Sequence, residues 1–411
     1  MPQPAARPSL TRLFFAAFVI RAAATLLSGQ GMEFPDTEHY VAMAGNIAGG
    51  AGWQVAPWAL AERPPLYPAF LALHLLLFGS VKAALATQAA LGAATCAAVA
   101  RIGERLWGAR AGALAGLLAA VYPALVFAST RLLSEALYVP LVVAQLLAAV
   151  EAGRAAFGRE GRRAAAWALA AGALGGLGAL THAGHLLFPA ALAAAVAFAW
   201  WRARQLSTPD GGGILVVGVL LLVSAHALVI APWTIRNHVV LGAFVPVTTQ
   251  GGKALYEASF PGATGGPVEW RDHPAGRGVH ERTLPMNEVE ADRTLRAEAW
   301  RAIREDPLRF AGLAAAKLVR LWSPVPNHEA FRTPGLLALV LLSYGPVLVL
   351  AGLGALRLRR GSILAVLLLA LPVYVTLLHL VFIGSLRYRI PVEPVLLLLA
   401  AYRVAGADDP S

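Results

Sequence analysis

The chain has 411 residues, of which 58% are hydrophobic and 14% charged, and its mean hydropathy is +0.62. This composition excludes an ordinary water-soluble enzyme and is typical of a polytopic membrane protein. The formal net charge of +11 does not indicate nucleic acid, because the basic residues lie in short clusters between apolar runs. The single cysteine, Cys96, excludes an intrachain disulfide and a cysteine-based metal site.

The first apolar run follows Arg7 and Arg12 and is interrupted by Arg21. Because no convincing small-residue cleavage site follows it, we interpret it as a retained transmembrane helix rather than a signal peptide. Runs close to the roughly 20 residues needed to cross a bilayer predict about ten spans. These lie at 11–29, 81–100, 111–129, 132–151, 165–181, 184–201, 213–231, 335–356, 362–382 and 391–406. The expected fold class is an all-α polytopic membrane protein.

The basic clusters between these spans all fall on the side of the N-terminus, which the positive-inside rule makes cytoplasmic. Most acidic residues then lie outside. Two outer segments are long, at about 30–80 and about 232–334. We therefore predict three parts: a transmembrane region at 1–232 that contains the first outer, catalytic loop, an outer loop at 233–334, and C-terminal transmembrane helices at 335–411.

The first outer segment begins with a short polar stretch, Glu33-Phe34-Pro35-Asp36-Thr37-Glu38-His39-Tyr40. It places three carboxylates and an imidazole where a chain leaving the membrane meets water. Asp36 is the candidate catalytic residue. The alternative is an acidic turn, in which Asp36 only caps a helix through Tyr40 to Ile47.

Other charged residues lie at the outer ends of spans, and each needs a reason because a charge near the membrane is costly. Arg131 and Glu135 are four residues apart, which fits either a local ion pair or an outer cavity. Arg236, Arg387 and Arg389 break the positive-inside trend. They fit either lipid headgroups or a phosphate, which arginine binds with a bidentate fork.

The second outer segment contains a helix start at Asn287, with Glu290 three residues on. An exposed amphipathic helix is expected from there to Arg304, and Pro307 ends it. The next stretch, Leu308 to Trp322, suits an interfacial helix. Between spans, His182 and His185 bracket a turn, but no third ligand is evident and a metal site is disfavoured.

Six short motifs follow one another along the chain. They are Asp36-x-x-x-Tyr40, Arg63-Pro64-Pro65-Leu66-Tyr67-Pro68, Arg131-Leu132-Leu133-Ser134-Glu135-Ala136-Leu137-Tyr138, Pro232-Trp233-Thr234-Ile235-Arg236-Asn237, Thr248-Thr249-Gln250-Gly251-Gly252 and Arg387-Tyr388-Arg389-Ile390-Pro391. In order and approximate spacing the set resembles the bacterial GT-C superfamily glycosyltransferases related to dolichyl-phosphate-mannose–protein mannosyltransferases and to the lipid A aminoarabinose transferase. The likeness covers nearly the whole chain and is specific for the superfamily rather than for a substrate.

This resemblance implies a GT-C-like helical bundle in the inner (plasma) membrane of a bacterium, a polyprenyl-phosphate-linked sugar as donor, and transfer on the extracytoplasmic face. It places a catalytic carboxylate at Asp36, with Glu38 close by, and another acidic residue at Glu135. Two departures matter. Thr37 follows Asp36 where many relatives carry an acid, and His182 stands where many carry an arginine.

The expected chemistry is inverting transfer to a lipid, glycan or protein acceptor, with Asp36 as general base. Glu38 and Glu135 would orient the acceptor or an arginine. Candidates for binding the leaving phosphate are Arg131, Arg236, Arg387, Arg389 and, more weakly, Lys253. The motifs also make four residues candidates for substrate binding: Tyr40, Arg63, Tyr67 and His182. No cofactor is required; a divalent cation is compatible with the carboxylates, although no spacing demands one.

Two other classes compete with this interpretation. A transporter or lipid flippase predicts ionisable residues in the middle of several spans or broken helices in two matching halves. Only Arg21 and His226 fit the first pattern, and no internal repeat is evident. A non-catalytic membrane scaffold would not need Asp36, Glu135 and outward arginines together.

Overall fold

A computed structural model describes residues 9–28, 34–205, 212–325, 332–358 and 363–405. Within these ranges the chain is helical, and the only β-type pairing is an isolated bridge between Ala56 and Ala59. The prediction of an all-α, multi-pass membrane protein is confirmed. Glu33, part of the polar stretch singled out above, lies outside the described residues.

Seven described helices are long and apolar enough to cross a membrane. These spans are Leu10–Leu27 (α1), Val81–Trp107 (η1 Val81–Ala83 with α4 Ala84–Trp107), Glu135–Phe157 (α7), Gly161–Thr181 (α8), Ala183–Arg204 (η2 Ala183–His185 with most of α9 Phe188–Gln205), Gly212–Leu241 (α10) and Pro334–Leu356 (α15). An eighth span results if Ala109–Val121 (α5) and Pro123–Ser129 (α6), which are bent by 56° at their junction, cross together.

The expected number of about ten spans is therefore not confirmed. The two missing members are Val366–Val381 (α16), with a preceding 3-10 turn at Ile363–Ala365 (η4), and Glu393–Ala405 (α17). At 1.5 Å per residue, α16 with its 16 residues reaches about 24 Å and α17 with 13 residues about 20 Å, both short of a hydrocarbon core of about 30 Å. The residues expected to begin the last span instead form a 3-10 helix, Leu386–Val392 (η5).

The bend between α5 and α6 explains the buried arginine in the first span. Pro123 has no N–H group, so the carbonyl of Ala119 loses its helical partner. The Arg21 guanidinium donates to that carbonyl at 3.1 Å and to the next one, Ala120, at 3.1 Å. Arg21 is 1% exposed. It therefore satisfies backbone groups rather than lining a transport pathway.

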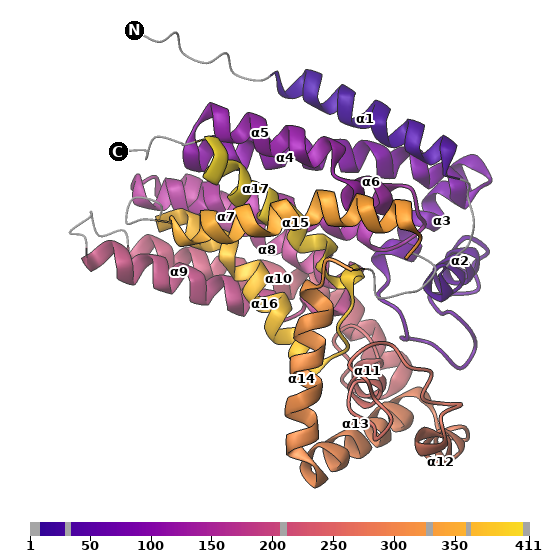
Figure 1. Cartoon of the computed structure of the whole chain (residues 1–411). Helices are drawn as coiled ribbons and strands as arrows, with labels where there is room; N and C mark the ends of the chain where they lie inside the picture. The colour runs from indigo at the N-terminus through magenta and orange to yellow at the C-terminus, as the bar shows by residue number, and fades with distance from the viewer. Residues whose placement is uncertain (1–8, 29–33, 206–211, 326–331, 359–362, 406–411) are drawn as a thin grey trace, which may run out of the picture.

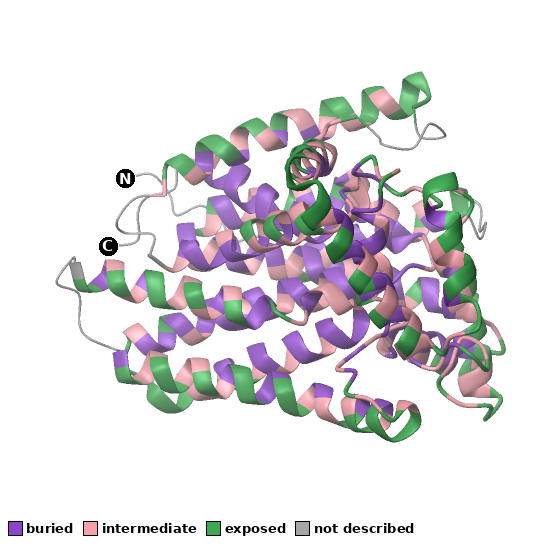
Figure 2. Cartoon of the chain, turned by 90° about the horizontal axis from the view of Figure 1, so that it is seen from below, coloured by how far each residue is buried: buried purple, intermediate pink, exposed green. Residues whose placement is uncertain are grey.

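Small residues bring the spans close together, as in other membrane bundles. The helices α4, α5, α7, α8 and α10 contribute most of this contact. At Gly172 on α8, a β-carbon would lie 2.2 Å from the carbonyl oxygen of Leu222 on α10, so only glycine fits. Buried residues fill the centre of the bundle (Figure 2). Most residues of α1 and α10 are exposed or partly exposed.

The helices of the two segments predicted to lie outside are found toward one end of the bundle, and α14 with its neighbours projects away from it (Figure 1). The first outer segment forms Pro35–Ala48 (α2) and Leu66–Phe78 (α3). The second forms a lobe of four helices, Gly251–Glu257 (α11), Pro274–Thr283 (α12), Glu288–Glu305 (α13) and Pro307–Trp322 (α14). Both described termini of the chain lie toward the opposite end of the bundle from α2 (Figure 1).

The helix start predicted at Asn287 is confirmed, because the Asn287 side chain accepts from the Glu290 N–H at 3.0 Å and the Glu290 carboxylate accepts from the Asn287 N–H at 3.2 Å. Two other expectations are wrong in detail. The seventh span continues through Pro232 to Leu241. The Asp36 side chain does not cap α2, which begins one residue earlier with Pro35 at its first position.

Candidate active site

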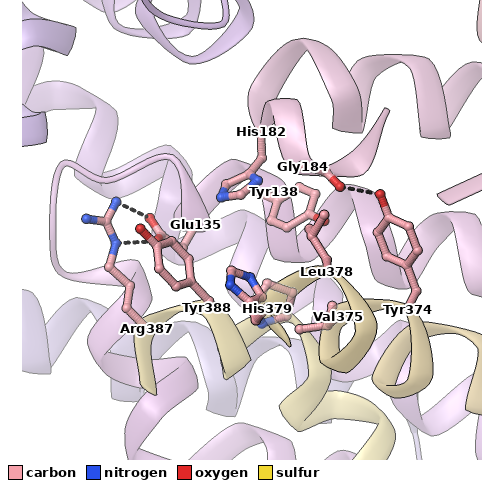
Figure 3. Close-up of a pocket in the computed structure, with 11 residues that line it drawn as sticks. Glu135, Tyr138, His182, Gly184, Tyr374, Val375, Leu378, His379, Arg387 and Tyr388 are labelled. Carbon is pink, nitrogen blue, oxygen red and sulfur yellow. Dashed lines mark hydrogen bonds and ion pairs between the residues drawn. The ribbon is translucent and has the colours of Figure 1, made fainter. Parts of the chain in front are cut away.

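Four charged side chains from four separate parts of the chain meet where α2, the start of α7 and η5 come together. The two oxygens of Asp36 each bind an arginine: Oδ1 lies 2.8 Å from Nη1 of Arg63, and Oδ2 lies 2.6 Å from Nη1 of Arg387. The same Arg387 also binds Glu135, through Nε and through Nη2 at 3.1 Å. Arg387 thus bridges two carboxylates (Figure 3 shows its pairing with Glu135). Two acids and two arginines balance in formal charge.

The helical period decides which acid of the first outer segment joins this cluster. Positions two apart on an α-helix point about 200° apart, whereas positions four apart share a face. Asp36 and Tyr40 accordingly face the bundle, and Tyr40 is 5% exposed. Glu38 is exposed and does not join the cluster. Of the two acids predicted here, only Asp36 is positioned to act.

Two tyrosines predicted as substrate-binding residues form a wall behind the cluster. The Tyr40 hydroxyl donates to Ser134 at 3.2 Å, and the Tyr67 hydroxyl donates to Gln88 at 2.9 Å. Their rings meet edge to face at 5.1 Å, and Tyr67 is fully buried. Both side chains are thus fixed. They hold the shape of the site, and the Arg63 guanidinium lies 5.7 Å from the Tyr40 ring.

Behind Glu135 and Arg387 lies a narrow pocket walled by rings (Figure 3). The ring of His182 stacks on Tyr138 at 4.9 Å, and the ring of His379 stacks on Tyr388 at 4.6 Å. Within the described part of the chain, Nδ1 of His182 is buried and makes no hydrogen bond. The cavity has a volume of about 20 Å³, which holds about one water molecule.

The charges of the site shift its proton equilibria. Burial raises the pKa of Asp36, but the Arg63 and Arg387 guanidinium groups outweigh burial, and the net pKa lies below the ordinary value. For Arg387, burial lowers the pKa and the Glu135 carboxylate raises it, so the net pKa lies well above the usual one. Burial lowers the pKa of His182. These directions favour an ionised Asp36, a protonated Arg387 and a neutral His182 at neutral pH.

Three predicted phosphate-binding residues are engaged elsewhere. The Arg236 guanidinium donates to the carbonyl of Leu60 at 2.8 Å. Arg389 is bound to Glu393 at 2.6 Å, with the two side chains only 4% and 1% exposed. Lys253 binds Glu62 at 3.3 Å.

Of the other two candidates, Arg387 belongs to the cluster and Arg131 packs on an aromatic ring. Its guanidinium is 5.3 Å from the ring of Phe127, and the local pair with Glu135 considered above gives way to the pair between Glu135 and Arg387. Among the candidate cations, Arg387 and Arg63 are therefore the two that contact Asp36.

Among the pocket residues that sequence reasoning missed are Tyr138, His379 and Tyr388. Tyr138 and Tyr388 lie inside quoted motifs, next to the charged residues that drew attention. The signal for His379 was an ionisable residue within an apolar run, which is the usual mark of a functional or structural role in a membrane helix. No cluster of three or more His, Cys, Asp or Glu side chains able to hold a metal occurs among the residues that the structure describes.

Solved structures define the class of this fold. The archaeal oligosaccharyltransferase AglB from Archaeoglobus fulgidus, in complex with an inhibitory peptide and a dolichol-phosphate, matches with a TM-score of 0.60 at 16% identity, over 96% of this chain and 50% of that chain. The apo form of the Archaeoglobus fulgidus oligosaccharyltransferase also gives 0.60 at 16% identity, over 95% and 50%. The chain shares this fold and spans about half the length of these proteins.

A sequence comparison adds a family match over part of the chain. Residues 62–229 match the family described as dolichyl-phosphate-mannose-protein mannosyltransferase. ArnT from Cupriavidus metallidurans bound to undecaprenyl phosphate is a further structural match, at a TM-score of 0.41 and 17% identity over 96% of this chain and 78% of that chain. No curated protein matches the sequence. The resemblance to GT-C membrane glycosyltransferases predicted from the motifs is confirmed.

Proposed function

We propose that this protein is an inverting glycosyltransferase that moves a sugar from a polyprenyl-phosphate-linked donor to an acceptor on the extracytoplasmic face of the membrane. The observation that carries this proposal is the bridge of Arg387 between Asp36 and Glu135. It puts Asp36, a carboxylate suited to proton abstraction, in direct contact with Arg387, a cation suited to binding a phosphate. The match of residues 62–229 to the mannosyltransferase family supports the same reaction class.

In the proposed reaction, Asp36 takes a proton from an acceptor hydroxyl or amine as that group attacks the anomeric carbon. The bond from the anomeric carbon to the phosphate oxygen breaks, and its electron pair leaves with the phosphate. Attack from the face opposite the phosphate inverts the anomeric centre, so no covalent sugar–enzyme intermediate forms. The polyprenyl phosphate leaves as an anion and needs no strong acid, but its charge must be stabilised.

Arg387 and Arg63 are the residues placed to stabilise that charge. Both now occupy the oxygens of Asp36, which makes this carboxylate a weak base. A donor phosphate competes for the same guanidinium groups, and arginine binds phosphate through a bidentate fork. When Arg387 turns to the phosphate, Asp36 loses a cation and becomes a stronger base. Proton abstraction is thereby coupled to the presence of a donor.

A second cavity supports the lipid part of the donor. It has a volume of about 390 Å³ and lies among α14, α15, α16 and α17, with walls that are almost entirely apolar. Trp322, at the end of α14, forms part of its lining. On the opposite face of α16, Val375 and Leu378 line the pocket beside Glu135. A prenyl chain in this cavity would lie one helix away from the charged site.

The acceptor and the sugar stay open within this proposal: a lipid, glycan or protein acceptor is compatible with the site. We place the reaction outside the inner membrane of a bacterium because the basic clusters predict a cytoplasmic N-terminus. We also propose that no divalent cation is required, because Asp36 and Glu135 already neutralise guanidinium groups.

The test uses the purified full chain, a polyprenyl phosphate, a panel of polyprenyl-phosphate sugars and the variant Asp36→Asn. Binding of the lipid phosphate by both forms, with sugar transfer or release only by the wild type, supports the proposal. If the wild type binds no lipid phosphate and turns over no donor, the proposal fails. Lipid transport in reconstituted vesicles that is unchanged in Asp36→Asn would instead favour a flippase.

A further inference from the structure

A short segment of the first outer loop, Leu60–Arg63, is held from outside by the second outer segment. The N–H groups of Leu60 and Ala61 donate to Oε1 of Glu288 at 3.1 and 3.2 Å. Oε2 of Glu288 accepts from the same Ala61 N–H at 3.2 Å and from the Thr249 hydroxyl at 2.9 Å. One carboxylate thus holds two successive peptide groups.

The carbonyl groups of the same two residues are also bound. Arg236 donates to the Leu60 oxygen at 2.8 Å, and the Thr249 N–H donates to the Ala61 oxygen at 3.0 Å. All four polar backbone groups of Leu60 and Ala61 therefore have partners, although this is a loop. Such saturation fixes the backbone in one position. Two motifs that the catalytic cluster does not use, those containing Arg236 and Thr249, serve this purpose.

The next two residues, Glu62 and Arg63, connect this fixed backbone to the active site. Glu62 accepts from Gln250 at 3.0 Å and from Lys253 at 3.3 Å. Arg63 then reaches inward, where its Nη1 lies 2.8 Å from Asp36 Oδ1 and its Nη2 lies 2.9 Å from Nδ1 of His39. The position of Arg63 is set by the segment immediately before it.

We infer that Glu288 is a positioning residue, which holds Leu60–Ala61 in place so that Arg63 binds Asp36. This inference deepens the proposed function and rests on it for its catalytic meaning. It connects the outer lobe to the general base through contacts in series: Glu288 to the loop backbone, the loop to Arg63, and Arg63 to Asp36. A change in the outer lobe would therefore alter the proton affinity of Asp36 without any direct contact with Asp36.

Glu288 suits this role better than its neighbours. It is the first residue of α13, directly after the Asn287 cap, where the helix end is fixed by the reciprocal pair with Glu290. Its own negative charge also faces Arg236, which holds the same loop from the carbonyl side. Its removal would leave two peptide N–H groups without an acceptor, whereas an amide in its place would keep one oxygen.

The test measures the proton affinity of Asp36 directly, without any turnover. A water-soluble carbodiimide reacts with protonated carboxyl groups, so labelling of Asp36 in the full-length protein is followed by mass spectrometry across pH. The charged and titratable groups that interact with Asp36 are Arg63, Arg387, His39, His182, Tyr40 and Tyr388, and all of them except Arg63 are kept in every variant. The variants are Glu288→Ala, Glu288→Gln and Arg63→Gln. The control is Glu281→Gln, which removes an exposed charge from α12 of the same lobe.

We expect Arg63→Gln to move the labelling midpoint to higher pH by about one unit, the lower end of the effect of a neighbouring arginine on an aspartate. Glu288→Ala should move it in the same direction, Glu288→Gln by less, and Glu281→Gln not at all. Glu288→Ala should add nothing once Arg63→Gln is present, because both act through one contact. An unchanged midpoint in Glu288→Ala, or an equal shift without Arg63, would overturn the inference.

Two controls keep the outcomes separate. Thermal unfolding and polyprenyl phosphate binding identify a variant that has lost its fold, and Glu288→Gln, which keeps the shape of the side chain, then carries the test. Labelling needs no substrate. If the wild type transfers no sugar but the labelling midpoint of Asp36 still shifts in Glu288→Ala, the proposed function is overturned and the positioning role of Glu288 stands.

Discussion

Glu135 and Arg387 lie 252 positions apart in the sequence and are joined by two hydrogen bonds in the structure. Glu135, at the first position of α7, is 2% exposed, and the guanidinium of Arg387 also bonds Asp36. The acid of one motif thereby orients the cation of another. This pair fixes the distance between the proposed base and the proposed phosphate ligand.

Removing Glu135 should therefore weaken both the fold and the reaction. Glu135→Ala leaves Arg387 with one carboxylate and is expected to lower the free energy of unfolding by about 1.5–3 kcal/mol, the range for hydrogen bonds to charged groups. Thermal unfolding in detergent measures this loss, with Glu281→Gln as the control for one lost charge. A melting temperature equal to that of the wild type would contradict the pairing.

The variants Asp36→Asn and Glu38→Gln separate the two acids of α2. Asp36→Asn should lower the transfer rate by about 10²–10⁴-fold, the usual contribution of a general base. Glu38→Gln should stay near the wild type, because the side chain is exposed and turned away from the cluster. Initial rates at saturating donor measure both. A large loss in Glu38→Gln would show that the acceptor is bound on the outer face of α2.

The pH profile should depend on whether the donor is bound. In the free protein the pKa of Asp36 is lowered, so its ion pairs stabilise the fold above the unfolded pKa of about 3.9, and this stability is lost as the pH falls through the lower folded pKa. The acidic limb of kcat/KM for the donor reports this free state. The acidic limb of kcat reports the donor-bound state, in which Arg387 has turned to the phosphate.

We therefore expect the acidic limb of kcat at a higher pH than that of kcat/KM. The measurement is a set of initial rates across pH at low and at saturating donor. Coincident limbs, or a kcat limb at lower pH, would mean that Arg387 stays on Asp36 when the donor binds.

Gly252 should be irreplaceable in the outer lobe. A β-carbon there would lie 1.9 Å from the carbonyl oxygen of Asp292, so Gly252→Ala forces α11 away from α13. The expected loss is about 1–3 kcal/mol of stability, as for other overpacked sites. Gly278→Ala on α12 is the matched control, because a β-carbon at Gly278 meets nothing within 4 Å. Equal melting temperatures of the two variants would contradict this packing.

Chelation of divalent cations should leave transfer unchanged. The charges of Asp36 and Glu135 are balanced by Arg63 and Arg387. Transfer rates before and after EDTA, with magnesium or manganese restored in a third sample, measure this. A loss that the added cation reverses would show that donor binding assembles a metal site from these carboxylates.

The sequence indicated the class, the family resemblance and Asp36, because hydropathy and local motifs are properties of neighbouring residues. It could not separate residues two positions apart. Arg387 and Arg389 belong to one motif, but η5 is a 3-10 helix with three residues per turn, so their side chains point about 120° apart. One meets Asp36 and the other is buried against Glu393. The role of each arginine depends on its partners from distant parts of the chain, and a local sequence pattern does not predict those partners.

The order in which the chain is made has a consequence for this cluster. Asp36 and Glu135 lie before α8, whereas Arg387, which links them, lies in η5, after α16. During synthesis the two acids must therefore wait for their shared cation until the helices from α8 to α16 have been made. A chain that stops before η5 has neither the bridge nor the proposed phosphate ligand. The proposed activity is thereby restricted to molecules in which η5 has packed against α2 and α7.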